Sequence, residues 1–240
     1  RPAMMGALGK VGFHMSYTYF TWRNTKKELT DYLVELSTVT DSFYRPNFFV
    51  NTPDINPTFL QTSGRPGFRI RAALAATLSP LWGVYSGFEL CEATPIPGRE
   101  EYLDSEKYEI RAWDWERMGH IREDITRLNR IRRENPAMWD FTNLEFLNAG
   151  NDQVVVYAKL TEACDNAILV AVNLDPAHAQ GTQFEVPLWR FGLDDAAGIA
   201  VEDLLTGSRF AWTGKIQHVR LDPQHNPYAI WRLIPPGLPS

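Results

Sequence analysis

Residues 44–59, YRPNFFVNTPDINPTF, hold a single carboxylate in a rigid setting. A short apolar run ends at Val50, an Asn-Thr pair follows, and Asp54 comes next, between Pro53 and Pro57. Because proline restricts the backbone, the Asp54 carboxylate would be held in place, with hydrogen-bonding groups beside it. We interpret Asp54 as a candidate functional carboxylate. The competing interpretation is an aspartate that caps a turn, since Asn, Asp and Pro often form turns.

A second candidate site is the pair Lys107 and Tyr108, within REEYLDSEKYEIRAWDW at residues 99–115. The same loop also holds Tyr102 and Trp113. An ammonium group beside aromatic rings suits sugar binding, because aromatic faces stack on apolar sugar faces and the ammonium donates to hydroxyls. An ordinary charged loop is the competing interpretation.

The other residues that could do chemistry form no recognisable pattern. The five histidines are scattered without metal-ligand spacing, so we predict no metal site. Neither a phosphate-binding glycine loop nor a Gly-x-Ser-x-Gly elbow is present in the sequence. Cys91 and Cys164 are far apart, and we expect two reduced thiols in a cytoplasmic protein.

The elements that would position these residues alternate between strands and helices in the first part of the chain. Strands are expected over residues 12–20, 47–50 and 81–85. Helices are expected after the capping-box pair Thr25 and Glu28, and over residues 68–78. This alternation is typical of a parallel α/β arrangement, in which chemistry lies at the carboxyl ends of strands.

The pattern changes after an expected helix over residues 115–135, which Pro136 ends. Period-two alternation then predicts strands over residues 154–158, 167–172, 184–188, 201–205 and 229–233. Their spacing favours an antiparallel β-sandwich. The predicted fold class is therefore α/β plus all-β, in two domains, residues 1–138 and residues 139–240.

Composition limits the partners. The chain has 240 residues, 44% hydrophobic and 22% charged, as in soluble globular proteins. Its net charge of -5 argues against nucleic acid as a partner, and we interpret Arg130, Arg132 and Arg133 as a solvated helix end. No apolar run is long enough to cross a membrane. The opening RPAMMGALGKVGF lacks an initial Met, so we expect a fragment of a longer protein.

Three stretches carry a family resemblance: YTYFTWRNTK at residues 17–26, FVNTPD at residues 49–54 and EKYE at residues 106–109. They closely resemble the α-1,4-glucan:maltose-1-phosphate maltosyltransferases, a branch of the α-amylase superfamily, and the resemblance covers essentially the whole chain. Most members of the superfamily have Asn-His-Asp before the third catalytic carboxylate. This chain has Thr52-Pro53-Asp54 there, the sequence expected for the maltosyltransferase branch.

The resemblance implies a retaining glycosyl transfer without metal or redox cofactor. Maltosyl units would pass from α-maltose 1-phosphate to the non-reducing end of an α-1,4-glucan acceptor, with release of phosphate. Asp54 would be the carboxylate that stabilises the transition state, and Lys107 and Tyr108 would hold the maltosyl unit of the donor. The parent protein would be a homodimer.

The resemblance also implies that the nucleophile and the acid/base residue lie upstream of Arg1. Residues 1–138 would then be the C-terminal strands and helices of a (β/α)8 barrel, followed by the β-sandwich domain. We therefore expect the chain alone to be inactive. Two alternatives stay open: another α-amylase relative, such as a glucan hydrolase or a trehalose synthase, and a non-catalytic glucan-binding module.

Overall fold

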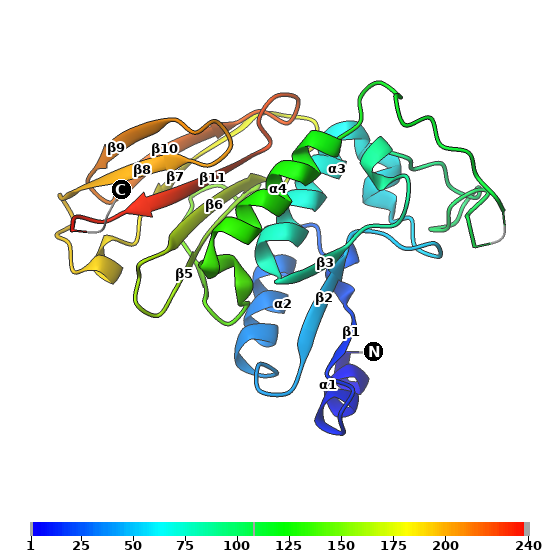
Figure 1. The fold of residues 1–240 in the computed structure, drawn as a ribbon, viewed down its shortest axis with the longest axis horizontal. Helices are drawn as coiled ribbons and strands as arrows, with labels where there is room; N and C mark the ends of the chain where they lie inside the picture. Colours follow the sequence, from blue (N-terminus) through cyan, green and yellow to red (C-terminus); the bar gives the residue numbers. More distant parts are fainter. Residues whose placement is uncertain (1, 108, 238–240) are drawn as a thin grey trace.

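The computed structural model describes residues 2–107 and 109–237 (Figure 1). Its N-terminal part contains a three-stranded parallel sheet in the order β1-β2-β3. The strands are β1 (Met15–Tyr17), β2 (Arg45–Phe49) and β3 (Leu81–Gly83), preceded by helix α1 (Pro2–Lys10). Helix α2 (Lys26–Thr38) connects β1 to β2, and helix α3 (Thr58–Leu78) connects β2 to β3. The predicted parallel α/β arrangement is thus present, although β1 is shorter than expected because a 3-10 turn, η1 (Tyr19–Trp22), follows it.

Helix α2 begins with the predicted capping box. The Thr25 hydroxyl accepts a hydrogen bond from the Glu28 amide, and the Glu28 carboxylate accepts one from the Thr25 amide. Each bond satisfies an amide that the first helical turn leaves unpaired. The apolar face of the helix buries Leu29, Tyr32, Leu33 and Leu36.

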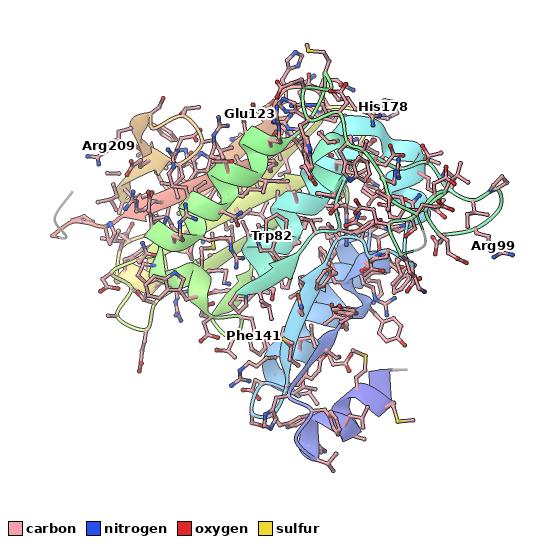
Figure 2. All side chains as sticks on the ribbon, turned by 45° about the vertical axis from the view of Figure 1, so that its right-hand side comes forward. Trp82, Arg99, Glu123, Phe141, His178 and Arg209 are labelled. Atoms are coloured by element: carbon pink, nitrogen blue, oxygen red, sulfur yellow. The ribbon has the colours of Figure 1, made fainter. Side chains whose placement is uncertain are left out.

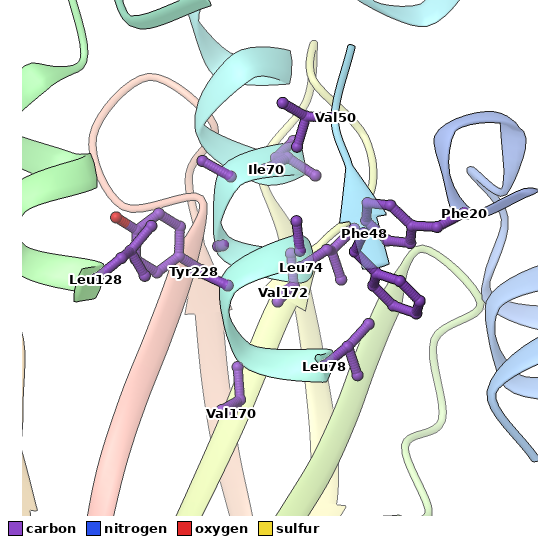
Figure 3. Packing of buried hydrophobic residues seen from close by; sticks show 14 of the residues in the cluster. Phe20, Phe48, Val50, Ile70, Leu74, Leu78, Leu128, Val170, Val172 and Tyr228 are labelled. Carbon is purple, nitrogen blue, oxygen red and sulfur yellow. The ribbon is translucent and has the colours of Figure 1, made fainter. Parts of the chain in front are cut away.

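Helix α3 is buried on nearly all sides over its second half. It begins ten residues before the predicted start, because a kink at Gly64 (φ 60°, ψ −165°) joins an earlier segment to the alanine-rich run. Figure 3 shows Phe48 of β2 and Val50, just past its end, on one side of this helix, and Val170 and Val172 of the C-terminal sheet on another. A helix packed between two sheets needs apolar residues around its circumference, which explains its composition.

Helix α4 (Arg122–Glu134) is shorter than the predicted helix over residues 115–135. Met118, within that predicted range, is 92% exposed, and Gly119 has a φ of +83°, which is not a helical value. The short helix η2 (Phe88–Leu90) is the one helical turn between β3 and α4 in the described part of that segment. Trp82 of β3, which Figure 2 labels, donates from its indole to the Asn129 side chain of α4 at 3.2 Å.

The interpretation of the arginine cluster as a solvated helix end is wrong for Arg132. Its guanidinium donates to the carbonyls of Ala76 and Pro80 and, at 2.7 Å, to that of Ser79. These carbonyls lie at the C-terminal end of α3, where a cation is favourable. Burial lowers the pKa of Arg132 to about 10, which leaves it charged at neutral pH.

The C-terminal part is a two-layer antiparallel β structure. A six-stranded sheet has the order β4-β5-β6-β11-β8-β9, and β10 pairs with β7 in a second sheet. The strands are β4 (Leu144–Phe146), β5 (Val154–Leu160), β6 (Ala167–Asn173), β7 (Gln180–Glu185), β8 (Gly198–Asp203), β9 (Arg209–Thr213), β10 (Ile216–Leu221) and β11 (Tyr228–Ile234). Two 3-10 turns, η3 (Pro136–Trp139) and η4 (Leu188–Phe191), complete this part.

Every residue of β5 and β6 is buried, because both faces of the six-stranded sheet are covered. Alternate side chains such as Val156 and Leu169 face the small sheet, and their neighbours Val155 and Val170 face α3. The arrangement is of the β-sandwich type that the strand spacing predicted.

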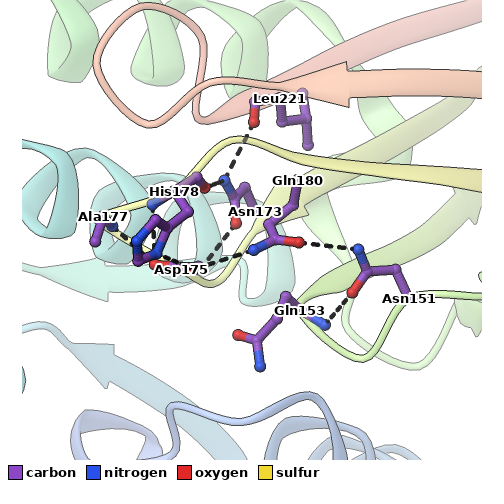
Figure 4. Close-up of polar contacts among 8 residues, drawn as sticks. All are labelled: Asn151, Gln153, Asn173, Asp175, Ala177, His178, Gln180 and Leu221. Carbon is purple, nitrogen blue, oxygen red and sulfur yellow. Dashed lines mark hydrogen bonds and ion pairs between the residues drawn. The ribbon is translucent and has the colours of Figure 1, made fainter.

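Polar groups close one end of this β structure (Figure 4). The buried Asn173 side chain donates to the carbonyls of His178 and Leu221, at 2.9 and 3.2 Å. Asp175 accepts from the His178 ring and from the Gln180 amide, both at 3.0 Å. His178 therefore has a local structural role.

The helices and the C-terminal sheet are joined by a buried polar cluster. Asp124 of α4 accepts hydrogen bonds from Arg69 of α3 (3.0 Å) and from the Tyr228 hydroxyl of β11 (2.9 Å). The same apolar core continues from β2 through α3 to β6. The division at residues 138 and 139 stays a prediction.

Among residues 2–107 and 109–237, no helix combines the length and apolar composition needed to cross a lipid bilayer. Cys91 and Cys164 are both free thiols, as expected.

Candidate functional site

The site begins at the carboxyl end of β2, where the chain makes a tight turn. The Thr52 amide donates to the Ile55 carbonyl and the Ile55 amide to the Thr52 carbonyl, both at 3.1 Å. Pro53 and Asp54 form the tip of this turn, and the Asp54 amide donates to the Thr52 hydroxyl at 3.2 Å. We call residues 52–55 the acidic turn. Its proline and its paired amides hold the backbone of Asp54 in place.

The structure brings Asp54 and Lys107 together although 53 positions separate them. The Lys107 Nζ lies 2.6 Å from the Asp54 Oδ1, and the two side chains are 42% and 59% exposed. Such an exposed ion pair contributes only about 0–1 kcal/mol to stability. Its significance is therefore the position of two charges at the carboxyl edge of a parallel sheet. Tyr108, the third predicted site residue, lies outside the described residues.

Lys107 is carried by a loop that is fixed to its surroundings. The Glu106 amide donates to the Tyr85 hydroxyl at 2.8 Å, just beyond β3. The Glu106 carboxylate accepts from the Trp113 indole at 3.0 Å. Gly87, with a φ of +95°, makes room for that indole, since a Cβ there would lie 2.4 Å from the Trp113 ring.

Asn51 forms the base of the site. Its side chain is fully buried and does two tasks: Oδ1 accepts from the Tyr85 amide at 2.8 Å, and Nδ2 donates to the Tyr102 hydroxyl at 2.7 Å. The sequence predicts Asn51 as a hydrogen-bonding group beside Asp54. The structure instead gives it a scaffolding position that joins the ends of β2 and β3 to the long loop.

Tyr102 is not a sugar-stacking surface, because only 3% of it is exposed. Burial raises the pKa of the Tyr102 hydroxyl above its usual range, so it stays protonated. Trp115 remains 47% exposed in the same long loop. Tyr17, at the end of β1, is 60% exposed, and its ring contacts that of Phe49 with centroids 4.6 Å apart.

Sequence reasoning missed the part played by Glu100. Its Oε1 accepts from the Thr58 amide at 2.8 Å and its Oε2 accepts from the Trp22 indole at 2.9 Å. Pro57 provides no side-chain cap for α3, so Glu100 caps this helix from a distant loop. The Thr58 hydrogen bond is the main cause that lowers the pKa of Glu100. A contact across 42 positions leaves no signal in local sequence.

No group of three His, Cys, Asp or Glu side chains in the described ranges is arranged to hold a metal ion. What the arrangement does offer is an accessible carboxylate of fixed backbone position beside an ammonium group. Tyr17, at the end of the neighbouring strand β1, adds an exposed aromatic ring to the same edge of the sheet. These are groups that bind sugar hydroxyls and stabilise developing positive charge.

The sequence has close relatives along its whole length. Residues 146–233 match the family described as "GLGE, C-terminal". The chain is 60% identical over all 240 residues to the α-1,4-glucan:maltose-1-phosphate maltosyltransferase of Cereibacter sphaeroides. It is 58% identical over 97% of its length to the protein of that name in Pseudomonas aeruginosa. It spans 36% and 35% of these two relatives, about a third of each.

Solved structures of low sequence identity share the fold. The α-amylase of Geobacillus thermoleovorans, solved with acarbose, superimposes with a TM-score of 0.72 at 14% identity, covering 98% of this chain and 52% of the amylase. The maltogenic α-amylase AmyB of Thermotoga neapolitana gives a TM-score of 0.69 at 15% identity, with coverage of 94% and 52%. The chain thus has the fold of the matching part of α-amylases, and its sequence corresponds to a C-terminal part of proteins named α-1,4-glucan:maltose-1-phosphate maltosyltransferase.

Proposed function

We propose that this chain is part of a retaining maltosyltransferase that takes maltosyl units from α-maltose 1-phosphate. The acceptor is the non-reducing end of an α-1,4-glucan, and phosphate is released. The observation that carries the proposal is the Asp54–Lys107 pair at the carboxyl edge of the parallel sheet. It occurs in a chain that is 60% identical to a protein named for this activity.

The proposal includes a (β/α)8 barrel of which residues 1–138 supply the last strands and helices, with residues 139–240 as a separate β-sandwich domain. Support comes from the strand–helix alternation and from the two outer strands, β1 and β3, of the three-stranded parallel sheet. Met15 in β1 is 55% exposed and Leu81 in β3 is 41% exposed, as expected where further strands would pair. The longer relatives have the length to supply them.

In the proposed reaction an upstream carboxylate attacks the anomeric carbon, and the bond to the phosphate oxygen breaks. A second upstream carboxyl group acts as acid and then as base, removing the proton from the acceptor hydroxyl that displaces the enzyme carboxylate. Asp54 binds sugar hydroxyls and stabilises the positive charge of the oxocarbenium-like transition state. Lys107 and Tyr108 hold the maltosyl unit of the donor.

Other parts of the proposal concern the whole parent protein. It needs no metal or redox cofactor, works in the cytoplasm and forms a homodimer. The chain by itself lacks the nucleophile and the acid/base residue, and removing a nucleophile alone costs on the order of 10⁶-fold in rate. We therefore propose that the isolated chain is inactive.

A fusion enzyme tests the role of Asp54. The aligned C-terminal part of the Cereibacter sphaeroides relative is replaced by these 240 residues, because the two are 60% identical there. Phosphate release from α-maltose 1-phosphate is measured with a malto-oligosaccharide acceptor. Asp54→Asn should lower kcat by roughly 10²–10³-fold or more, as for other groups that stabilise transition-state charge.

The matched control is Asp104→Asn, an exposed aspartate three residues before Lys107. This variant should keep the activity of the fusion enzyme. Full activity of Asp54→Asn would contradict the proposed role. Release of free maltose without phosphate dependence would favour a hydrolase, and glucan binding without turnover would favour a binding module.

A further inference from the structure

We propose that Ser105 is a positioning residue, whose hydroxyl sets the Asp54 carboxylate against the Lys107 ammonium. The effect on activity rests on the proposed function, whereas the positional effect does not. Ser105 lies in the long loop after β3 and is only 4% exposed, unlike Asp54 and Lys107 themselves.

The Ser105 hydroxyl makes a contact on each side of the ion pair. Its Oγ donates to the carbonyl oxygen of Pro53 at 3.1 Å, directly before Asp54. The same Oγ accepts from the backbone amide of Lys107 at 3.3 Å. A serine hydroxyl has one donor and can accept as well, so a single side chain ties both backbone segments together.

Two further contacts between described residues hold the backbone around Lys107. The Glu109 amide donates to the Ser105 carbonyl at 2.9 Å and closes a turn around Lys107. The Glu106 amide bonds to the Tyr85 hydroxyl, which anchors the loop to the end of β3. Ser105 adds the connection from this loop to the carbonyl beside Asp54.

The ion pair alone does not fix the distance between the Asp54 carboxylate and the Lys107 ammonium. Both of its side chains are accessible to water, where an ion pair is weak and its long side chains move. The distance between the two charges is therefore set by the backbones that carry them. A displacement of about 1 Å in a catalytic group can cost on the order of 10²-fold in rate. A buried hydroxyl that joins the two backbones is suited to prevent it.

The first test uses the fusion enzyme and three substitutions. Ser105→Ala removes the hydroxyl, Ser105→Cys keeps a similar volume with a much weaker hydrogen-bonding group, and Ser105→Thr keeps the hydroxyl. We expect Ser105→Ala and Ser105→Cys to lower kcat for phosphate release by about 10–10²-fold. The kcat of Ser105→Thr should stay close to that of the unmodified fusion enzyme. In an Asp54→Asn background, Ser105→Ala should have less than about a twofold further effect, because the group it positions is gone.

A merely structural role would give a different result. Ser105→Ala would then lower the thermal unfolding midpoint and reduce activity by the same factor in both backgrounds. That additive outcome would overturn the proposal, as would a Thr variant that folds like the unmodified fusion but has the low activity of Ala.

Hydrogen–deuterium exchange of the same fusion proteins provides a readout that needs no activity. Ser105→Ala should speed amide exchange in peptides covering both the acidic turn and residues 105–109, and Ser105→Thr should restore it. Ser86→Ala, in the exposed loop after β3, is the matched control and should change neither peptide. Faster exchange confined to residues 105–109, or none, would overturn the proposal. If no fusion releases phosphate, the proposed function fails while this exchange test still decides the role of Ser105.

Discussion

Lys159 is a fully buried cation in β5 that pairs with no carboxylate in the described part of the chain. Its ammonium donates to the carbonyl of Asp140. Burial, and to a lesser extent the charge of Arg132, lowers the pKa of Lys159 to about 7, against an ordinary value of 10.5, while Asp140 raises it slightly. The folded protein therefore binds this proton less tightly than the unfolded chain does.

The sign of the resulting pH dependence follows from linkage. Below pH 7 both states carry the proton, and Lys159 adds no slope. Between about pH 7 and 10.5 the unfolded chain keeps the proton that the folded protein has lost, so stability rises with pH, by up to about 1.4 kcal/mol per pH unit. Lys159→Met should remove this rise and be more stable than the unmodified chain at pH 6.

Urea unfolding followed between pH 6 and pH 9 measures this contribution. Lys27→Met is the matched control, because Lys27 is an exposed lysine, 83% accessible, in an i,i+4 pair with Asp31. The control should keep the slope of the unmodified chain. An unchanged slope in Lys159→Met would contradict the account of Lys159.

At the site, sequence reasoning could identify residues but not their contacts. Asp54 was found from its prolines and its place after a strand, which are local features. Its pairing with Lys107, the burial of Ser105 and the two bonds of Asn51 all join positions more than 30 apart. Such contacts depend on the complete fold. The sugar-stacking hypothesis for Tyr102 failed for this reason, since its burial is a tertiary property.

Among the elements, the predictions that succeeded rest on local signals. The capping box of α2 and the apolar, β-branched runs of β5 and β6 are examples. Strands β9 and β10 were missed because their apolar patterns are weak. In β9, Phe210 and Trp212 share a face, but the strand has only five residues and four of them are exposed. In β10, Ile216 points outward while Val219 and Leu221 are the less exposed residues, so no clean alternation is visible. The helix expected over residues 115–135 was too long at its start, because Gly119 has a positive φ and α4 begins only at Arg122.

The kink of α3 gives a prediction at this scale. Gly64 has φ 60° and ψ −165°, a conformation that is open essentially to glycine alone. A Cβ at this position would meet no atom closer than the Pro66 Cδ at 3.9 Å, so space is not limiting. Gly64→Ala should therefore destabilise the chain by about 1–3 kcal/mol through backbone strain alone.

Urea unfolding again provides the measurement, with Gly150→Ala as control. Gly150 has open space around its Cα and is not among the glycines of positive φ, so its substitution should have little effect. Equal effects of the two substitutions would contradict the strain at Gly64.

At the scale of the whole molecule, α3 and the six-stranded sheet share one core, and Asp124, Arg69 and Tyr228 join them by hydrogen bonds. The change of sequence pattern after the expected helix over residues 115–135 predicted parallel α/β structure followed by antiparallel strands, and both are present. It could not predict how closely the two parts pack. The apolar circumference of α3 and the contacts of Arg132 are explained only by tertiary packing around α3. The six-stranded sheet thus packs against α3, the helix that connects the acidic turn to β3 (Figure 1).

The central claim is that these residues supply one catalytic carboxylate to a site completed by upstream residues. Phosphate release from α-maltose 1-phosphate, with a malto-oligosaccharide acceptor, tests it most directly when the 240-residue chain and the fusion enzyme are compared. We predict release by the fusion enzyme and none by the chain alone. Release by the chain alone would contradict the account of the missing nucleophile, and a correctly folded fusion enzyme without release would contradict the donor assignment.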